Sequence, residues 1–276
     1  MRWILLIFVG LKKQRFMLQK VGNSLFSYYR FEHLAERTEL IHFISSGDHT
    51  IGFSEQQTAA TICYNRKLLA ETVGFEVNNL VTGHQVHGTH VAVVGKDDAG
   101  KGALSAESRF PNTDALVTDC EGVCLMVLSA DCVPVLFYDP SRRVIAAAPA
   151  GWRGTAANIV GEVVAKMQQH WKCEPKNILA AIGPSIGPCC FEVDEEVAAV
   201  FRTSYPDMVH AGICEGKYQV DLWNVNRYEL LKAGLVDSNI EVAEVCTVCS
   251  RESFFSYRRQ GKTAGRFGAG ICLRHS

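Results

Sequence analysis

The sequence has no excess of either charge and no long hydrophobic run. Its 276 residues carry 28 Lys+Arg against 29 Asp+Glu, a formal net charge of −1. Without a basic surplus there is no bulk electrostatic reason to expect nucleic acid as the main partner. Hydrophobic residues make up 47% and charged residues 21%. This ordinary composition excludes a disordered tail, a coiled coil and a collagen-like rod.

Several common signatures are also missing. The sequence contains no Gly-rich phosphate loop of Walker or Rossmann spacing, which counts against a nucleotide-driven or nicotinamide enzyme. Its 11 cysteines show no regular spacing of a disulfide framework, so we expect reduced thiols in a cytoplasmic protein. The Cys246–Cys249 pair has CxxC spacing but no second pair, and we interpret it as structural. Adjacent Cys189 and Cys190 are a weak signal.

The N-terminus is considered apart from the rest of the chain. Residues 1–16 are expected to form an extension outside the fold, and residues 17–276 a single domain. The apolar run Trp3–Leu11 is too short to span a bilayer, and no small-residue cleavage site follows it. We interpret it as a start-codon artefact or an extension, with Met17 as the working start. A surface anchor or a poor signal sequence is the open alternative; for the domain itself no membrane association is expected.

The spacing of apolar residues predicts strands and helices that are mixed rather than strictly alternating. Strand character also runs from 79 to 94, with an interruption at 83–88. The fold class expected is α/β of the mixed α+β kind, a single domain with mixed β-sheets flanked by helices. The clearest predicted strands are Leu40–Ile44, Ala115–Thr118, Val123–Ser129, Val133–Tyr138, Val144–Ala148 and Ile178–Ile182. The predicted helices are Thr58–Val73, Thr155–His170, Asp194–Phe201 and Leu222–Ala233.

Polar residues end buried apolar runs at three strand-to-loop junctions. These junctions are Gln85–Gly88, Ser129–Pro134 and Ala150–Gly154. His87 and Cys132, brought together by the fold, could form a nucleophile–base pair or supply the imidazole and thiolate of a metal site. Asp131 could orient a neighbouring group, and Arg153 could hold an anion such as phosphate. Taken alone, each of these residues is more often structural than functional.

Taken in order, the motifs resemble those of a known family. The series consists of Gln85–Gly88, Ala130–Val135, Ala150–Gly154, Ile182–Gly187, Cys246-Thr247 and Phe254–Arg259. It is similar to the bacterial purine nucleoside phosphorylases of YfiH type, also labelled laccase-domain or polyphenol oxidase-like proteins, over roughly residues 25–272. The resemblance implies a single mixed α/β domain. It also implies phosphorolysis of adenosine, inosine and S-methyl-5′-thioadenosine to free base and ribose 1-phosphate, with adenosine deaminase activity.

The resemblance further implies a zinc site of His, Cys and His. The first two ligands fall on His87 and Cys132, but the third position is Pro149, which has no side-chain ligand. Catalytic zinc normally keeps three protein ligands, so zinc occupancy is in doubt. Rescue by His84 or His90 is not expected, because three residues along a strand would place them on the opposite face. Deamination, which needs an activated water, should suffer more than phosphorolysis.

The expected site therefore has two parts. Catalytic roles are assigned to His87, Cys132 and Asp131, and phosphate contacts to Arg66 and Arg153. Arg66 enters because the family also tends to carry Asn-Arg at this point of the predicted helix. The partners expected are purine nucleosides and phosphate; the oligomeric state stays open.

Three other functions compete with this interpretation. A Cys–His hydrolase or deamidase would use Cys132 as nucleophile and His87 as base. A nucleoside-binding protein would have kept the pocket and lost turnover. Copper-dependent phenol oxidation is disfavoured, because none of the 9 histidines lies in the His-x-His pairs that a multicopper site requires.

Overall fold

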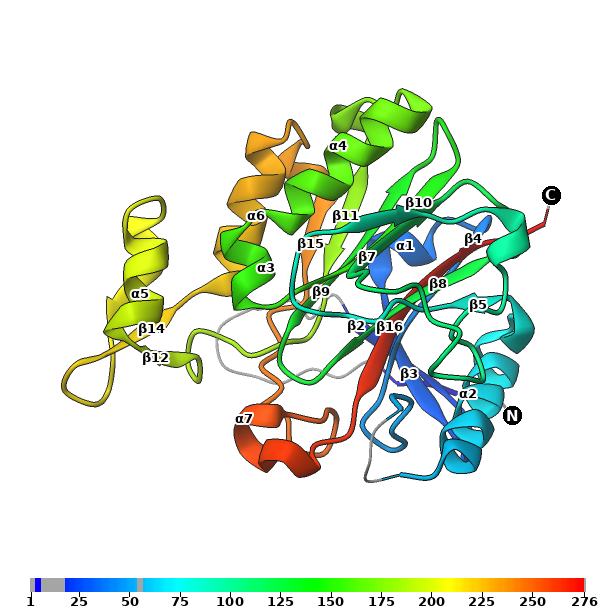
Figure 1. Cartoon of the computed structure of the whole chain (residues 1–276), viewed down its shortest axis with the longest axis horizontal. Coiled ribbons are helices and arrows are strands. Elements are labelled where there is room, and N and C mark those ends of the chain that lie inside the picture. Colours follow the sequence, from blue (N-terminus) through cyan, green and yellow to red (C-terminus); the bar gives the residue numbers. More distant parts are fainter. Residues whose placement is uncertain (1–2, 6–17, 54–56, 276) are drawn as a thin grey trace.

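The structure, a computed structural model, describes residues 3–5, 18–53 and 57–275. Within these ranges the strands form two large sheets and one small sheet (Figure 1). The seven-stranded sheet has the order β1 (Trp3–Leu5), β2 (Leu18–Gly22), β3 (Ser27–Phe31), β4 (Leu40–Ser45), β16 (Phe267–Leu273), β8 (Cys124–Ser129), β5 (Leu80–Val81). The six-stranded sheet has the order β15 (Ile240–Val242), β11 (Leu179–Ile182), β9 (Val133–Asp139), β10 (Val144–Ala150), β7 (Ala115–Thr118), β6 (Val91–Val93).

The two large sheets pack face to face. Strand β10 of one sheet contacts β8 and β16 of the other. Alternate residues of these strands point into the space between the sheets, and they form a buried core that includes Leu125, Val127, Leu136 and Ile271. This arrangement places the end of β8 and the start of β9 on neighbouring layers, so the short turn between them crosses the edge of the sandwich.

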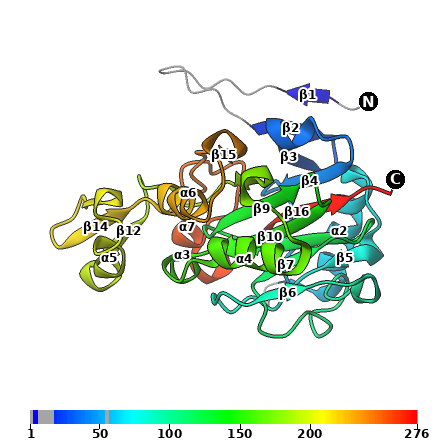
Figure 2. The same ribbon diagram turned by 90° about the horizontal axis from the view of Figure 1, so that it is seen from above.

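Helices cover both outer faces of the sandwich. Helix α2 (Ala59–Val73) packs Leu69 and Val73 against the seven-stranded sheet. On the other side lie α3 (Trp152–Ala156), α4 (Ile159–Trp171) and α6 (Leu222–Lys232), whose apolar residues share one core with β9 and β10 (Figures 1 and 2). The prediction of a mixed α+β fold with helices flanking β-sheets is confirmed.

The remaining described helices are short. They are α1 (Glu32–Ala35), α5 (Glu195–Arg202) and α7 (Tyr257–Gln260). Helix α5 packs on the small sheet of β12 (Glu192–Asp194), β14 (Lys217–Val220) and β13 (Val209–Ala211), which projects to one side of the sandwich (Figure 1). Its first strand, β12, is part of the wall of the cavity described below.

Most predicted elements are present, with one helix divided. The predicted helix Thr58–Val73 is α2, and Thr58 is its N-cap, accepting a hydrogen bond from Thr61 N at 3.2 Å. The single helix predicted over Thr155–His170 is wrong, because α3 and α4 are separate. Asn158 has φ +57° and caps α4 by accepting from Gly161 N at 3.0 Å. Asparagine tolerates this left-handed conformation, so it ends one helix and begins the next.

The strand character expected over residues 79–94, interrupted at 83–88, is found as two short strands, β5 and β6, separated by a longer gap than expected. Strand β5 pairs with β8 in one sheet, whereas β6 pairs with β7 in the other. Residues 82–90 form the non-helical crossing between the two layers. His84, His87 and His90 therefore do not lie along one strand, and the opposite-face argument against His84 and His90 does not apply.

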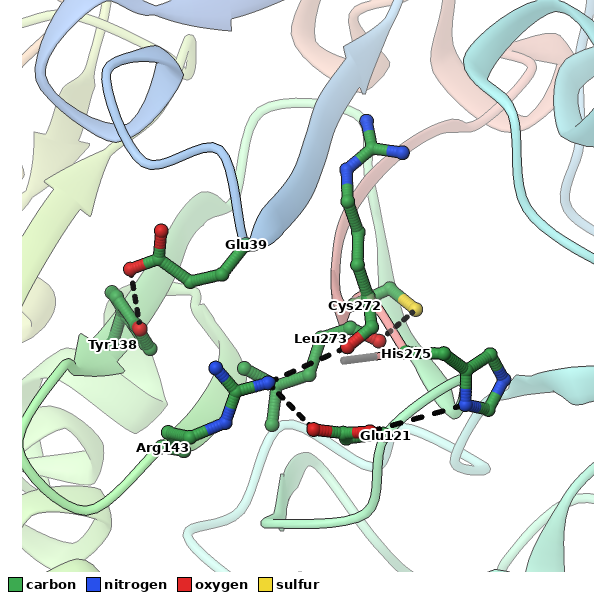
Figure 3. A network of polar contacts seen from close by, with 8 residues as sticks. Glu39, Glu121, Tyr138, Arg143, Cys272, Leu273 and His275 are labelled. Atoms are coloured by element: carbon green, nitrogen blue, oxygen red, sulfur yellow. Dashed lines mark hydrogen bonds and ion pairs between the residues drawn. The ribbon is translucent and has the colours of Figure 1, made fainter.

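The C-terminal segment is tied to the sandwich by polar contacts. Tyr138 donates to Glu39 Oε1 at 2.8 Å, and Arg143 contacts Glu121 Oε1 at 2.7 Å (Figure 3). Burial and the neighbouring Glu39 carboxylate raise the pKa of Tyr138 well above its usual value. His275 lies 4.0 Å from the other oxygen of Glu121. Arg143 Nη2 also donates to Arg274 O at 3.4 Å, so the β9–β10 turn is joined to the residues that follow β16.

The N-terminal segment is described only in part. Residues Trp3–Leu5 pair with β2 as an antiparallel edge strand. The rest of the expected extension, residues 1–2 and 6–16, lies outside the described residues. In the described ranges, no helix combines the length and the apolar character needed to cross a bilayer.

Candidate active site

A cavity of about 760 Å³ opens where the sandwich meets the projecting small sheet. Its volume falls in the range of small-molecule pockets. Segments from many parts of the chain line it, and they include the three junctions singled out in the sequence. The lining includes Phe53, His84, Gln85, His87, Arg109, Ser129, Asp131, Cys132, Gly151, Trp152, Ile186, Phe191, Glu192, Asp194, Tyr257, Arg258 and Arg266.

Asp114 holds the loop that carries His87. Its Oδ1 accepts from the backbone N–H groups of Val86 and His87 at 3.0 and 2.8 Å, and its Oδ2 accepts from Gly88 N at 2.9 Å. Asp114 is 1% exposed, and His87 has φ +62°. Non-glycine residues rarely adopt this conformation, so the three bonds keep His87 in an uncommon backbone state. Asp114 lies outside the motifs that the sequence singles out.

Gln85 fixes the same loop to the other wall of the cavity. Its Nε2 donates to Leu128 O at 2.9 Å, and its Oε1 accepts from Leu128 N at 2.8 Å. The side chain thereby pairs with the backbone of Leu128, near the end of β8, as a neighbouring strand would. His87 is thus held between β7, through Asp114, and β8, through Gln85.

His87 and Cys132 meet at Gly151. A Cβ built on Gly151 would lie 2.8 Å from Cys132 Sγ and 3.5 Å from His87 Nδ1, so both atoms border the same small space. Ser129 helps to fix the turn by donating to Cys132 O at 2.6 Å. Burial, with a contribution from the Asp131 and Asp114 carboxylates, raises the pKa of Cys132 to about 11. Its thiol is therefore protonated at neutral pH when no metal is bound.

Asp131 lines the cavity, yet both of its carboxylate oxygens accept hydrogen bonds from other segments of the protein. Oδ1 accepts from Thr247 Oγ1 at 2.6 Å, and Oδ2 accepts from Arg258 N at 2.6 Å. Its φ of +95° is another left-handed value at a non-glycine residue. Asp131 thereby joins the β8–β9 turn to the two C-terminal loops, and these contacts suit a positioning role.

The expected zinc site lacks a third ligand in the structure. Pro149 is buried near the end of β10, paired with Pro134. Among the described residues, no third His, Cys, Asp or Glu ligand atom converges with those of His87 and Cys132. Two protein ligands do not meet the requirement of a catalytic zinc site, so the residues present do not fit this group. His84 lines the cavity but does not complete the set.

The arginines that line the cavity are not those expected. Arg109, Arg258 and Arg266 line it, whereas Arg153 is exposed beside it and lies over the Trp152 ring at 4.2 Å. The positive charge of Arg266 partly opposes the rise in the pKa of Cys132, so the guanidinium lies near the thiol. Its hydrogen bonds to Ala264 O and Gly265 O use only Nη1.

Arg66 occupies a different environment from the one expected. Its side chain is fully buried, and it is outside the cavity lining. Nε donates to Ile51 O at 2.7 Å, and Nη1 donates to Ala103 O at 2.8 Å and to Gly102 O. The guanidinium also lies 4.6 Å from the centre of the Phe53 ring. These contacts support a structural role behind the cavity wall rather than contact with phosphate.

Comparison with known proteins identifies the family to which this fold and these cavity motifs belong. The chain belongs to the family described as "Multi-copper polyphenol oxidoreductase laccase", which matches residues 45–274. The purine nucleoside phosphorylase YlmD of Geobacillus stearothermophilus is 42% identical over 213 residues, covering 76% of this chain and 78% of the relative. The adenosine deaminase RL5, from an unknown prokaryotic organism, is 36% identical over 209 residues, with 75% and 79% covered.

Solved structures agree with this assignment. The crystal structure of YlmD from Geobacillus stearothermophilus matches with a TM-score of 0.86 at 34% identity, over 92% of this chain and 98% of that one. The Bacillus licheniformis protein YfiH matches with a TM-score of 0.85 at 30% identity, over 92% and 99%. The predicted family membership is confirmed, and the relatives' names indicate an enzyme.

Proposed function

We propose that this chain is a purine nucleoside phosphorylase acting on adenosine, inosine and S-methyl-5′-thioadenosine. The observation that carries the proposal is one cavity combining three arginines, His87 and several aromatic rings. Arginine suits phosphate because its planar fork donates two parallel hydrogen bonds. The rings of Phe53, Phe191 and Tyr257 offer apolar surface for a purine. The names of the relatives support the same reaction.

In the proposed reaction a phosphate oxygen forms a bond to C1′ of the ribose while the bond from C1′ to the purine nitrogen breaks. The electron pair of that bond leaves with the base, which takes a proton. Arg266 and Arg109 hold the phosphate, and their charge stabilises it next to the sugar. His87 donates the proton to the departing purine. Asp131 keeps the wall formed by Thr247 and Arg258 in place.

No step of this reaction requires a metal ion at the expected zinc site, where Pro149 replaces the third ligand. Deamination of adenosine, in contrast, needs a water activated for attack on the purine ring, and a metal is the usual means. We therefore propose that deamination is weak in this chain compared with phosphorolysis. Zinc at His87 and Cys132 would need the ligand that Pro149 replaces.

Two observations bear on the other proposed features. The raised pKa of Cys132 counts against a Cys–His hydrolase, which needs a reactive thiolate. All 11 cysteines are free, which supports a cytoplasmic location, where thiols stay reduced. A nucleoside-binding protein without turnover is the remaining alternative.

The proposal is tested by phosphate-dependent release of hypoxanthine from inosine, with and without zinc, beside the Pro149→His variant. The expected result is release by the unaltered protein that does not depend on zinc. The variant with zinc should gain deamination of adenosine. Release only from the zinc-loaded variant would contradict metal-free phosphorolysis. Binding of inosine without release under any of these conditions would favour a binding protein.

A further inference from the structure

A second group of potential metal ligands lies outside the His87 and Cys132 site. The four thiols of Cys189, Cys190, Cys246 and Cys249, here called the cysteine cluster, have sulfur atoms that all lie within 4.8 Å of one another. The Sγ atom of Cys249 is 3.8 Å from that of Cys189 and 3.5 Å from that of Cys190. The fold thus brings together two pairs of cysteines that are far apart in the sequence. Neither pair alone predicts a four-cysteine cluster.

These separations match a tetrahedral metal–thiolate centre. Zn–S bonds of about 2.3 Å in a tetrahedron place neighbouring sulfur atoms about 3.8 Å apart. A disulfide needs sulfur atoms about 2.05 Å apart, and none of the four cysteines forms one. The cluster therefore needs only small shifts to accept an ion, and four thiolates select a thiophilic metal such as zinc.

The backbone around Cys246 also suits a thiolate ligand. Gly187 N donates to Cys246 Sγ at 3.3 Å. Such donors partly neutralise the negative charge of thiolates around a metal. The turn Cys246–Cys249 folds back so that both of its sulfur atoms face Cys189 and Cys190.

The cysteine cluster lies directly behind one wall of the cavity. Ser185 pairs with Cys246 as an isolated bridge, and Thr247 N donates to Ser185 O at 3.0 Å. Thr247, between the two cysteines of the turn, donates to Asp131. On the other side of the cluster, Cys190 O accepts from Arg258 Nη1 at 3.0 Å. An ion in the cluster would therefore join the two loops that support Asp131 and Arg258.

We propose that the cysteine cluster binds one zinc ion as a structural centre that fixes this wall of the cavity. Zinc binding converts the thiols to thiolates and releases their protons to solvent. No oxidation or reduction takes place. The site is independent of His87 and Cys132 and does not depend on the proposed reaction.

The test measures metal content and a spectrum rather than activity. The full chain is purified under reducing conditions, its zinc is measured by elemental analysis, and the zinc is then replaced by Co²⁺. Cys249→Ser and Cys246→Ser remove cluster ligands. Cys214→Ser, an exposed cysteine outside the cluster, and Cys132→Ser are the matched controls.

We expect one zinc ion per chain, and a Co²⁺ form with strong sulfur-to-metal charge-transfer absorption. Both zinc and absorption should fall by more than about tenfold in Cys249→Ser and stay unchanged in the two controls. Loss of zinc in Cys132→Ser, or retention in Cys249→Ser, would overturn the proposal. A disulfide within the cluster, detected by mass spectrometry without reductant, would also overturn it.

If the cluster variants do not fold, measurements on the unaltered chain still test the proposal. Removing zinc with a chelator should then lower the unfolding temperature, and adding zinc back should restore it. Absence of zinc and of thiolate absorption in the folded chain would contradict the proposal.

Discussion

Replacing Asp114 by Asn should lower the activity of the site, although Asp114 itself does not contact the substrate. The carboxylate accepts three backbone N–H bonds of 2.8–3.0 Å around His87. An amide keeps one acceptor oxygen but turns an NH₂ group toward one of these donors. Losing one bond to a charged group and weakening two others costs about 3 kcal/mol locally. That loss releases His87 from its left-handed backbone conformation, φ +62°.

The expected consequence is a fall of about 100-fold in kcat for inosine phosphorolysis, the usual effect of misplacing a catalytic group by about 1 Å. The KM for phosphate should change by less than about twofold, because Arg266 and Arg109 belong to other segments. Steady-state kinetics and thermal unfolding measure both effects. Asp97→Asn, at an exposed acidic residue, is the control. Unchanged kcat in Asp114→Asn would refute the positioning of His87 by Asp114.

Three further substitutions test other parts of the structure. Burial raises the pKa of Glu241 to about 7 from 4.5, so the folded state retains a proton that the unfolded chain loses, and the stability of the native protein falls as pH rises from 4.5 to 7. Glu241→Gln should therefore gain up to about 3 kcal/mol over the native protein above pH 7 and nothing at pH 4; equal denaturant midpoints at both pH values would contradict this. Gly151→Ala would place a Cβ 2.8 Å from Cys132 Sγ, and kcat/KM should fall at least about tenfold as the thiol is displaced; full activity would show that the space tolerates a methyl group. Arg66→Met should lower the free energy of unfolding by about 3 kcal/mol, since buried carbonyl groups lose their donors, with KM for phosphate unchanged in the folded fraction; a raised KM with full stability would restore the phosphate role.

The sequence was most informative where function depends on a continuous segment. The motifs around His87, Cys132 and Gly151 each lie at the end of a strand, and β8, β9 and β10 bring them to one cavity. The helix α2 followed from its apolar spacing. These features depend on residues a few positions apart, which the periodicity of apolar residues can detect.

Contacts between distant segments could not be predicted in the same way. Asp114 was a polar residue before a buried strand, and nothing local indicated three bonds to a loop 26–28 residues earlier. Arg66 was assigned to phosphate because the resembling family tends to carry Asn-Arg at this point, whereas the fold buries it against carbonyl groups of other segments. Arg258 lies in the motif Phe254–Arg259, but no local pattern indicated that its backbone N–H holds Asp131. The cysteine cluster likewise joins residues about 60 positions apart.

The central claim is that this protein transfers the ribose of a purine nucleoside to phosphate without a zinc ion at the site where Pro149 replaces the third ligand. The most direct measurement is ³¹P NMR of the zinc-free protein with inosine and inorganic phosphate. The account predicts a new ribose 1-phosphate resonance that grows in step with hypoxanthine. Hypoxanthine released with free ribose and no phosphate ester would indicate hydrolysis, and it would contradict the claim.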